Sequence, residues 1–361
     1  AGRPVRVRPA YEMQKEMGAV FGLNYGWEHP AYFDAETPDS AGFTRQPWWE
    51  SVGREARMLR EKAGIIDISN FAKYRVKGAG AEDWLNAVFA NRMPRVVGKS
   101  CLTPLIGVRG GIAGDATVTR IAEDEFWIVS SGMAERYQQR FYDMVPLPEG
   151  TTFESLTVSH CGFNVAGPQS RALLQRLTNT SLETADFPFM ASRMIEVAGV
   201  SCMALRVSFT GDLGWELHCA AEDQIRLYTA LLEAGKDIGA GPVGSRALMS
   251  LRLEKGYGSW GREYSPEYWP QEVGLERLCK MDKEFLHKSA AAEVMQNPWR
   301  ERMVLVALDA DAVAASGADA TGGEPIFKDG KGIGRVTSGA YGYGVDMALA
   351  LGFVKDAQPG D

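Results

Sequence analysis

GGIAGDATVTR, residues Gly110–Arg120, combines a glycine-rich start with an end typical of a β-strand. Glycine accepts positive φ and permits close approach of another backbone, whereas Thr and Val favour extended structure. The pattern predicts a tight turn that leads into a strand. Asp115 lies where the two meet, so its carboxylate is suited to general acid–base chemistry or to stabilising a cation. The alternative is that Asp115 only caps the turn by accepting bonds from backbone N–H groups.

A second stretch, SFTGDLGWELH at Ser208–His218, predicts a β-hairpin made of a strand, a glycine turn and a second strand. Side chains along a strand alternate between its two faces. We therefore expect Glu216 and His218 to share one face and Trp215 and Leu217 to share the other.

A third stretch, SRALMSLRLEKG at Ser245–Gly256, predicts a helix with a serine at its N-cap and a glycine at its C-terminal end. The glycines 239, 241 and 244 before it match the spacing G-x-G-x-x-G. A dinucleotide-binding fingerprint requires a strand directly before it, and Glu233–Asp237 is typical of a turn. We therefore predict a turn into the helix and no dinucleotide site.

Together and in this order, the three stretches resemble the aminomethyltransferase family of the glycine cleavage system, the T-protein. The chain looks still more like the folate-binding C-terminal half of the dimethylglycine and sarcosine dehydrogenases. The segments that carry this closer resemblance are WEHP (Trp27–Pro30), AGIIDIS (Ala63–Ser69), RLEKGY (Arg252–Tyr257) and WGRE (Trp260–Glu263). The resemblance extends over nearly the whole chain.

Length and composition set wider bounds. A chain of 361 residues has room for two or three domains, and its net charge of −7 argues against nucleic-acid or anionic-membrane partners. We find no apolar run of about 18 residues and no apolar signal core at the N-terminus. We therefore expect a cytoplasmic protein, or one of the mitochondrial matrix in a eukaryote. The 5 cysteines and 4 histidines are scattered, so we expect reduced thiols and no metal site.

The order of predicted strands and helices favours an α+β fold with mainly antiparallel sheets. Residues 1–46, rich in aromatic side chains, are predicted to form a connector or wrapping arm. Residues 47–295 are predicted to form the folate-binding region, with two α+β (ferredoxin-like) units at about 47–160 and 161–295 around a central folate site. The short strands and glycine turns of residues 296–361 favour a small β-barrel. It ends in the short polar stretch Asp356–Asp361, so we expect its last strands to be missing or supplied elsewhere.

The resemblance also implies roles for individual residues. Asp115 matches the catalytic aspartate, which would orient the nucleophile, accept its proton and offset the charge of an incoming iminium. Glu216 matches the glutamate that binds the pterin, since a carboxylate accepts two N–H donors at once. Arg246 matches an arginine that contacts folate, whose tail carries carboxylates. The alternative for Glu216 and Arg246 is an ordinary surface ion pair.

The other folate-contacting positions are apolar or aromatic. Phe71 and Leu102 align with the lining of the family's folate pocket, although both could equally be core residues. Trp260 and Tyr257 could flank the aromatic middle of folate, or simply pack. Phe209 stands where the family commonly has Tyr, so its ring can stack but the hydroxyl is lost.

The function implied is a tetrahydrofolate-dependent one-carbon transferase. It would form 5,10-methylenetetrahydrofolate from an iminium or from formaldehyde, produced by oxidation of an N-methyl amine such as dimethylglycine or sarcosine. FAD is expected only if a flavin domain precedes the chain or a flavoprotein subunit joins it. The alternatives are a demethylase or methyltransferase acting on a sulfonium or methoxy donor, and a folate-binding domain without catalysis.

Overall fold

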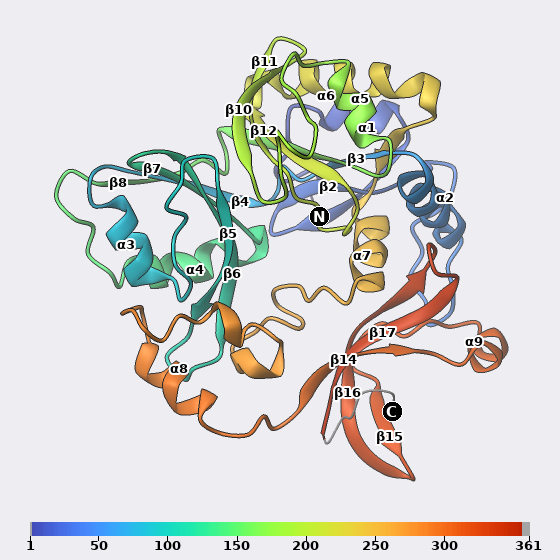
Figure 1. The fold of residues 1–361 in the computed structure, drawn as a ribbon. Coiled ribbons are helices and arrows are strands. Elements are labelled where there is room, and N and C mark those ends of the chain that lie inside the picture. The colour runs from blue at the N-terminus through green and yellow to red at the C-terminus, as the bar shows by residue number, and fades with distance from the viewer. Residues whose placement is uncertain (1, 356–361) are drawn as a thin grey trace.

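The computed structural model describes residues 2–355 and confirms the α+β fold. Figure 1 shows two large sheets in the upper half of the molecule and a separate C-terminal sheet below them. Every pair of neighbouring strands is antiparallel except one, as the sequence pattern predicts. The arrangement of the two large sheets determines where the predicted site residues lie.

The first sheet has five strands in the order β5-β6-β7-β4-β8. Helices α3 (Ala81–Val88) and α4 (Glu135–Tyr142) cover one of its faces and enclose a core around Tyr74, Phe126 and Ile128. The other face carries Asp115. The strands are β4 (Ala72–Lys77), β5 (Ser100–Ile106), β6 (Ile112–Ala122), β7 (Glu125–Ser130) and β8 (Thr152–Ser155).

The predicted glycine turn connects β5 to β6. Gly110 has φ +79°, a conformation that side chains other than glycine's rarely allow. Gly111 lies so close to the segment that follows α7 (Ser245–Glu254) that a Cβ would come 2.2 Å from the carbonyl oxygen of Pro266. The turn is therefore confirmed, and the two glycines meet separate requirements, one for backbone conformation and one for space.

The second sheet has six strands in the order β10-β11-β12-β9-β3-β13. Trp215 and Leu217 point into a core shared with α5 (Ser170–Gln175) and α6 (Gln224–Gly235), and Glu216 and His218 lie on the opposite face, as predicted. The strands are β3 (Gly64–Asp67), β9 (His160–Ala166), β10 (Ser192–Val197), β11 (Val200–Leu205), β12 (Gly214–Ala220) and β13 (Gly241–Val243).

Two local predictions differ from the structure in the second sheet. Gly241–Val243 is a short strand, β13, which pairs in parallel with β3 and is not simply a turn. β3 itself comes from the first predicted unit, so the two sheets are not built from separate halves of the chain.

The loop between β11 and β12 is also longer than predicted, because the hydroxyl of Ser208 bonds to the Asn164 side chain and to Thr210, and so replaces strand pairing.

Helix α7 (Ser245–Glu254) confirms the third prediction except at its start. The N-cap is Gly244, and Ser245 is the first helical residue. The N–H of Gly244 donates to the Glu55 carboxylate at 2.7 Å, and a Cβ here would come 2.2 Å from the carbonyl oxygen of Ala31. The closeness of β2 (Trp27–Phe33), the strand that contains Ala31, therefore requires glycine at a position where serine is usually preferred.

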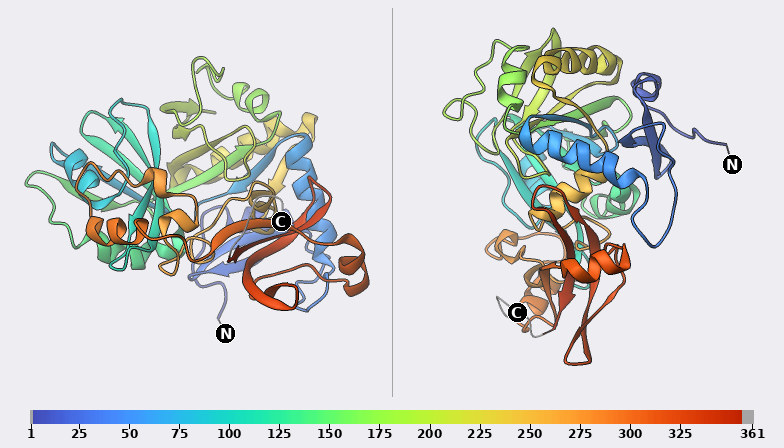
Figure 2. Two further views of the ribbon diagram at one scale, coloured as in Figure 1. Left: turned by 60° about the horizontal axis from the view of Figure 1, so that its bottom comes forward. Right: turned by 90° about the vertical axis from the view of Figure 1, so that its right-hand side faces the viewer.

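The N-terminal segment is ordered. It contains α1 (Tyr11–Glu16) and a hairpin of β1 (Ala19–Asn24) and β2 (Trp27–Phe33), which packs against α2 (Trp48–Glu61) and α7. The right-hand view of Figure 2 shows this hairpin, in dark blue, beside α2 on one flank of the molecule.

The C-terminal strands form one sheet in the order β14-β17-β16-β15. The buried ion pair of Arg252 and Glu263 (3.0 Å) connects α7 to this sheet, since both side chains also bond to Ser338 of β16.

The predicted polar end, Asp356–Asp361, lies outside the described residues. Within residues 2–355, no helix has the length and apolar character needed to cross a bilayer. The remaining elements are α8 (Lys288–Met295), α9 (Ala310–Ser316), β14 (Arg302–Ala307), β15 (Pro325–Lys328), β16 (Lys331–Gly342) and β17 (Met347–Val354).

Candidate functional site

The Asp115 face of the first sheet and the Glu216 face of the second sheet are turned toward each other. Thr119, on the same face of β6 as Asp115, pairs with Trp127 of β7. Trp127 packs against Met203 and Leu205 of the second sheet. Its ring centroid lies 6.4 Å from that of His218, the neighbour of Glu216. Asp115 and Glu216, far apart in the sequence, thus lie on two faces that pack toward each other, and the region between these faces is called the space between the sheets.

Asp115 is aimed by a local irregularity of its strand. The register between β5 and β6 shifts just before it, where Leu105 pairs with Gly114 and Ile106 with Ile112, so Ala113 is an extra, bulged residue. Bulges commonly redirect a side chain next to a functional site. On the edge strand β5, the residue paired with Asp115 is Pro104, which has no backbone N–H to donate.

The carboxyl group of Asp115 lies in an environment that disfavours its charge. One oxygen, Oδ1, is fully buried and has no hydrogen-bond partner. Burial raises the pKa of Asp115 from 3.8 to about 6, and its own backbone N–H offsets only part of this rise. The turn-capping alternative is not seen, since none of the described glycine-turn N–H groups bonds to this carboxylate.

Aromatic side chains surround this end of the site. The indole N–H of Trp260 donates to the carbonyl oxygen of Ala113 at 3.0 Å, which holds Trp260 next to the bulge. The ring of Tyr137 contacts that of Trp260, with centroids 5.6 Å apart. The pKa of Tyr264 is raised by burial and then by the charge of Asp115, which is therefore a near neighbour. An aromatic ring of a ligand would fit such surroundings.

Leu102 lies on β5, where it pairs with Thr117 of β6. It therefore shares the face of the sheet that carries Asp115. Its side chain is 37% exposed, so it is not simply a core residue. Its position is compatible with contact to a ligand between the sheets.

Glu216 is not part of a surface ion pair. It is 8% exposed, and its one hydrogen bond within residues 2–355 joins Oε2 to Nε2 of His218 at 3.2 Å. The neighbouring strand β9 places Asn164 directly opposite Glu216. Its other oxygen, Oε1, accepts no bond from these residues, so the carboxylate retains capacity to accept N–H donors.

Lys73 also lies in this space, and the sequence analysis did not identify it. It is fully buried, and its Nζ donates to the carbonyl oxygens of Ser69 (3.1 Å) and Phe71 (2.9 Å). Burial, and then the positive charge of Arg8, lower the pKa of Lys73 from 10.5 to about 8, while Cys161, Asp67 and Glu216 act in the opposite direction. In β4, apolar residues alternate with Lys73 and Arg75, a pattern that is normally read as one buried and one solvated face.

Phe71 and Phe209 pack against one apolar cluster that also contains α2 and α7 residues. The ring of Phe209 stacks on Tyr257, with centroids 6.3 Å apart and planes at 25°. Phe71 is linked to the space between the sheets because its carbonyl oxygen accepts the bond from Lys73.

Arg246 contacts the N-terminal segment. Its guanidinium donates to Asp39 at 2.8 Å and lies over the ring of Trp48, 4.2 Å from the centroid. These are contacts with the N-terminal segment and the start of α2, which is the ion-pair alternative given above. Its Nη1 atom is buried without a partner.

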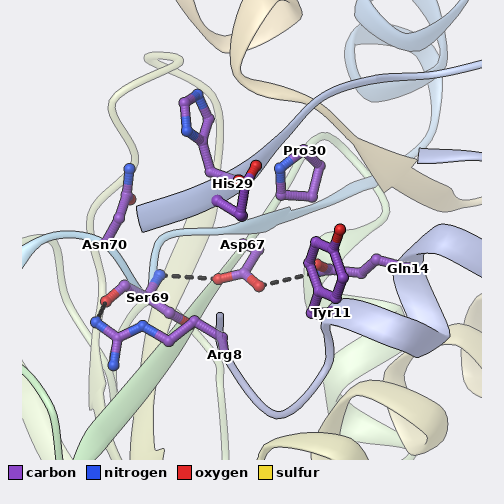
Figure 3. Close-up of a pocket in the computed structure, with 9 residues that line it drawn as sticks. Arg8, Tyr11, Gln14, His29, Pro30, Asp67, Ser69 and Asn70 are labelled. Carbon is purple, nitrogen blue, oxygen red and sulfur yellow. Dashed lines mark hydrogen bonds between the residues drawn. The ribbon is translucent and has the colours of Figure 1, made fainter. Parts of the chain in front are cut away.

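A small polar cavity lies beneath the N-terminal segment (Figure 3). Its volume is about 10 Å³, enough for about one water molecule. Asp67 accepts bonds there from the Gln14 side chain (2.7 Å) and the Ser69 N–H (2.8 Å), and Arg8 donates to the Ser69 carbonyl at 2.6 Å. Because that carbonyl also accepts from Lys73, this cluster supports the Lys73 side of the site.

Comparisons with known proteins agree with this architecture. The family model described as the GCVT N-terminal domain matches residues 10–283, and that of the glycine cleavage T-protein C-terminal barrel domain matches residues 303–360. Dimethylglycine dehydrogenase of mouse mitochondria is 33% identical over 98% of this chain, and human mitochondrial sarcosine dehydrogenase is 28% identical over 100% of it. The matched regions are 41% and 43% of those proteins, so the chain spans less than half of their length.

A solved structure shares the fold. The glycine cleavage system aminomethyltransferase T of Bartonella henselae superposes with a TM-score of 0.82, covering 97% of this chain and 90% of the other, at 24% sequence identity. The two matched family models together extend over most of the sequence, with the barrel domain where short strands and glycine turns predict one. The chain therefore belongs to the aminomethyltransferase family of the glycine cleavage T-protein.

Proposed function

We propose that this chain is a tetrahydrofolate-dependent one-carbon transferase that forms 5,10-methylenetetrahydrofolate. The observation that supports this most directly is the Asp115 carboxyl group, with a buried, unbonded oxygen and a pKa raised to about 6. A carboxyl group with a pKa near the operating pH can both accept and return a proton. A buried acceptor without a donor is costly, and a ligand amine would provide that donor.

The residues of the site fit a folate. Tetrahydrofolate, when bound, would supply the amine nitrogens that take up the one-carbon unit. Glu216 would accept the N–H donors of the pterin edge through its unoccupied Oε1. Trp260 would pack against the ligand beside the Asp115 end. Asp115 would orient the reacting amine, accept its proton, and offset the positive charge of an iminium.

We propose an N-methyl amine, such as dimethylglycine or sarcosine, as the original source of the one-carbon unit. The two relatives named above are dehydrogenases of these compounds, and the chain spans less than half of each. Oxidation of the amine to an iminium or to formaldehyde requires an electron acceptor. We infer that a flavin domain or flavoprotein subunit would provide it and would pass the product to this chain.

The test is titration of the purified chain with tetrahydrofolate, followed by transfer from formaldehyde with identification of the folate product. Asp115→Asn should bind tetrahydrofolate within a few-fold of the parent chain, yet transfer at least about 100-fold more slowly, the range expected for loss of a general acid–base group. Asp124→Asn, an exposed residue of the β6–β7 turn, is the matched control. Transfer by Asp115→Asn at the parent rate would contradict the mechanism, and 5-methyltetrahydrofolate as product would favour the methyltransferase alternative.

A further inference from the structure

His218 lies beside Glu216 on the same face of β12. Its Nε2 atom is 3.2 Å from Oε2 of Glu216, and the imidazole is fully buried. A carboxylate can only accept hydrogen bonds, so Nε2 carries the proton of this pair. The contact fixes both the tautomer of His218 and the direction of the Glu216 side chain.

Within residues 2–355, the contact with Glu216 is the one hydrogen bond that the imidazole makes. Nδ1 is buried and has no partner within the described residues. Burial lowers the pKa of His218 below 6.5, so the ring has a single N–H at neutral pH. That N–H is the one directed at Glu216.

The neighbouring strand is adapted to the ring. Gly162 of β9 pairs with His218, and a Cβ at this position would come 2.8 Å from Nδ1. Real Cβ atoms do not approach this closely, so the strand leaves room for the imidazole only with glycine here. On the other sheet, Trp127 borders the ring with centroids 6.4 Å apart. The imidazole is therefore held by packing on both sides.

We propose that His218 is a positioning residue for folate binding, which holds the Glu216 carboxylate so that Oε1 is presented to the N–H groups of the pterin ring. This inference rests on the function proposed above. A free glutamate side chain would sample several rotamers and would have to be ordered when the ligand binds. The bond from His218 removes that requirement before the ligand arrives, as preorganisation does elsewhere.

The experiment compares three substitutions by titration with tetrahydrofolate. His218→Gln can place an amide N–H near the position of Nε2, whereas the shorter side chain of His218→Asn reaches only toward the position of Nδ1. His218→Leu removes the donor. We expect Leu and Asn to weaken binding about 10- to 100-fold, the effect of a hydrogen bond to a charged group, and Gln to remain within about threefold of the parent chain.

If His218 had a purely structural role, the affinities of the three variants for tetrahydrofolate would follow a different order. Packing depends on the volume of the side chain and not on the position of one N–H. Thermal unfolding of each variant identifies any that has lost its fold, and if His218→Leu does not fold, the comparison of Gln with Asn decides. Equal affinity of Gln and Asn, whether strong or weak, would overturn the inference.

The result also separates this inference from the function on which it depends. Failure of the folded parent chain to bind tetrahydrofolate would overturn both. Binding that Glu216→Gln weakens but the His218 series leaves unchanged would overturn only the role of His218. Gly162→Ala, which pushes the ring away from its position, should weaken binding in the same direction as His218→Asn.

Discussion

Asp115→Asn should make the protein more stable at neutral pH, and the gain should disappear in acid. An aspartate whose pKa is about 6 in the folded state and 3.8 in the unfolded state binds its proton more tightly when folded. The folded state is therefore penalised wherever the unfolded state is ionised, which is above about pH 4. The penalty grows as pH rises and becomes constant above the folded pKa.

The size of this free-energy penalty follows from the folded and unfolded pKa values of Asp115. At roughly 1.36 kcal/mol per pKa unit, ionisation of Asp115 should cost the folded state about 3 kcal/mol at pH 7.5, about 1.6 kcal/mol at pH 5 and about 0.6 kcal/mol at pH 4. An uncharged asparagine of similar shape avoids that cost. For a chain of 361 residues, 3 kcal/mol corresponds to a rise in Tm of about 4 °C, given roughly 2.1 cal/mol/K of unfolding entropy per residue.

The assay is differential scanning calorimetry of the parent chain, Asp115→Asn and the exposed control Asp124→Asn at pH 4, 5 and 7.5. The difference in Tm between Asp115→Asn and the parent should increase with pH, whereas the control should follow the parent throughout. A difference that is the same at pH 4 and 7.5 would show that Asp115 is not desolvated in the folded protein. Asp115 would then lack the raised pKa that suits it to accept and return a proton.

Two further predictions concern stability away from the site. Arg252→Met should lower the free energy of unfolding by about 3–5 kcal/mol, because it leaves Glu263 charged and buried without its cation, and Arg252→Met combined with Glu263→Leu should recover much of this in calorimetry. If Arg252→Met lowers the free energy of unfolding by less than the double variant does, the expected penalty of an unpaired Glu263 is refuted. Gly111→Ala should lower the free energy of unfolding by about 1–3 kcal/mol or more, since its Cβ would collide with the Pro266 carbonyl. The control is Gly332→Ala, whose Cβ would meet only the Phe327 ring at 3.8 Å. Its free energy of unfolding, from the same calorimetry, should stay within about 1 kcal/mol of the parent value.

Residues that depend on local pattern were predictable. Alternation along one strand placed Glu216 with His218 and Trp215 with Leu217, because the strand period holds wherever the strand forms. The glycine turn before β6 was also predictable, because a positive φ strongly selects glycine. The family resemblance then favoured a catalytic role for Asp115, which stays a prediction and which the strand pattern alone did not distinguish from a turn cap.

Other features depend on contacts between distant segments. Ser245 was expected at the N-cap of α7, but the closeness of Ala31 requires glycine at position 244. The bond of Arg246 to Asp39 of the N-terminal segment was not predicted, and its contact with folate stays a prediction. Nothing in the sequence around either residue indicates which segment will pack there.

Most strands and helices, and the side chains that share a face, could be read from the sequence, because they follow from preferences and periodicities of consecutive residues. Which faces meet depends on long-range packing. The tertiary structure buried Lys73 fully, on a face of β4 that a simple alternation of apolar and charged residues would leave to solvent. Within residues 2–355, it also left Oδ1 of Asp115 and Nδ1 of His218 without partners. Burial and the pKa shifts that it causes depend on what covers a face, and that covering comes from segments far away in the chain.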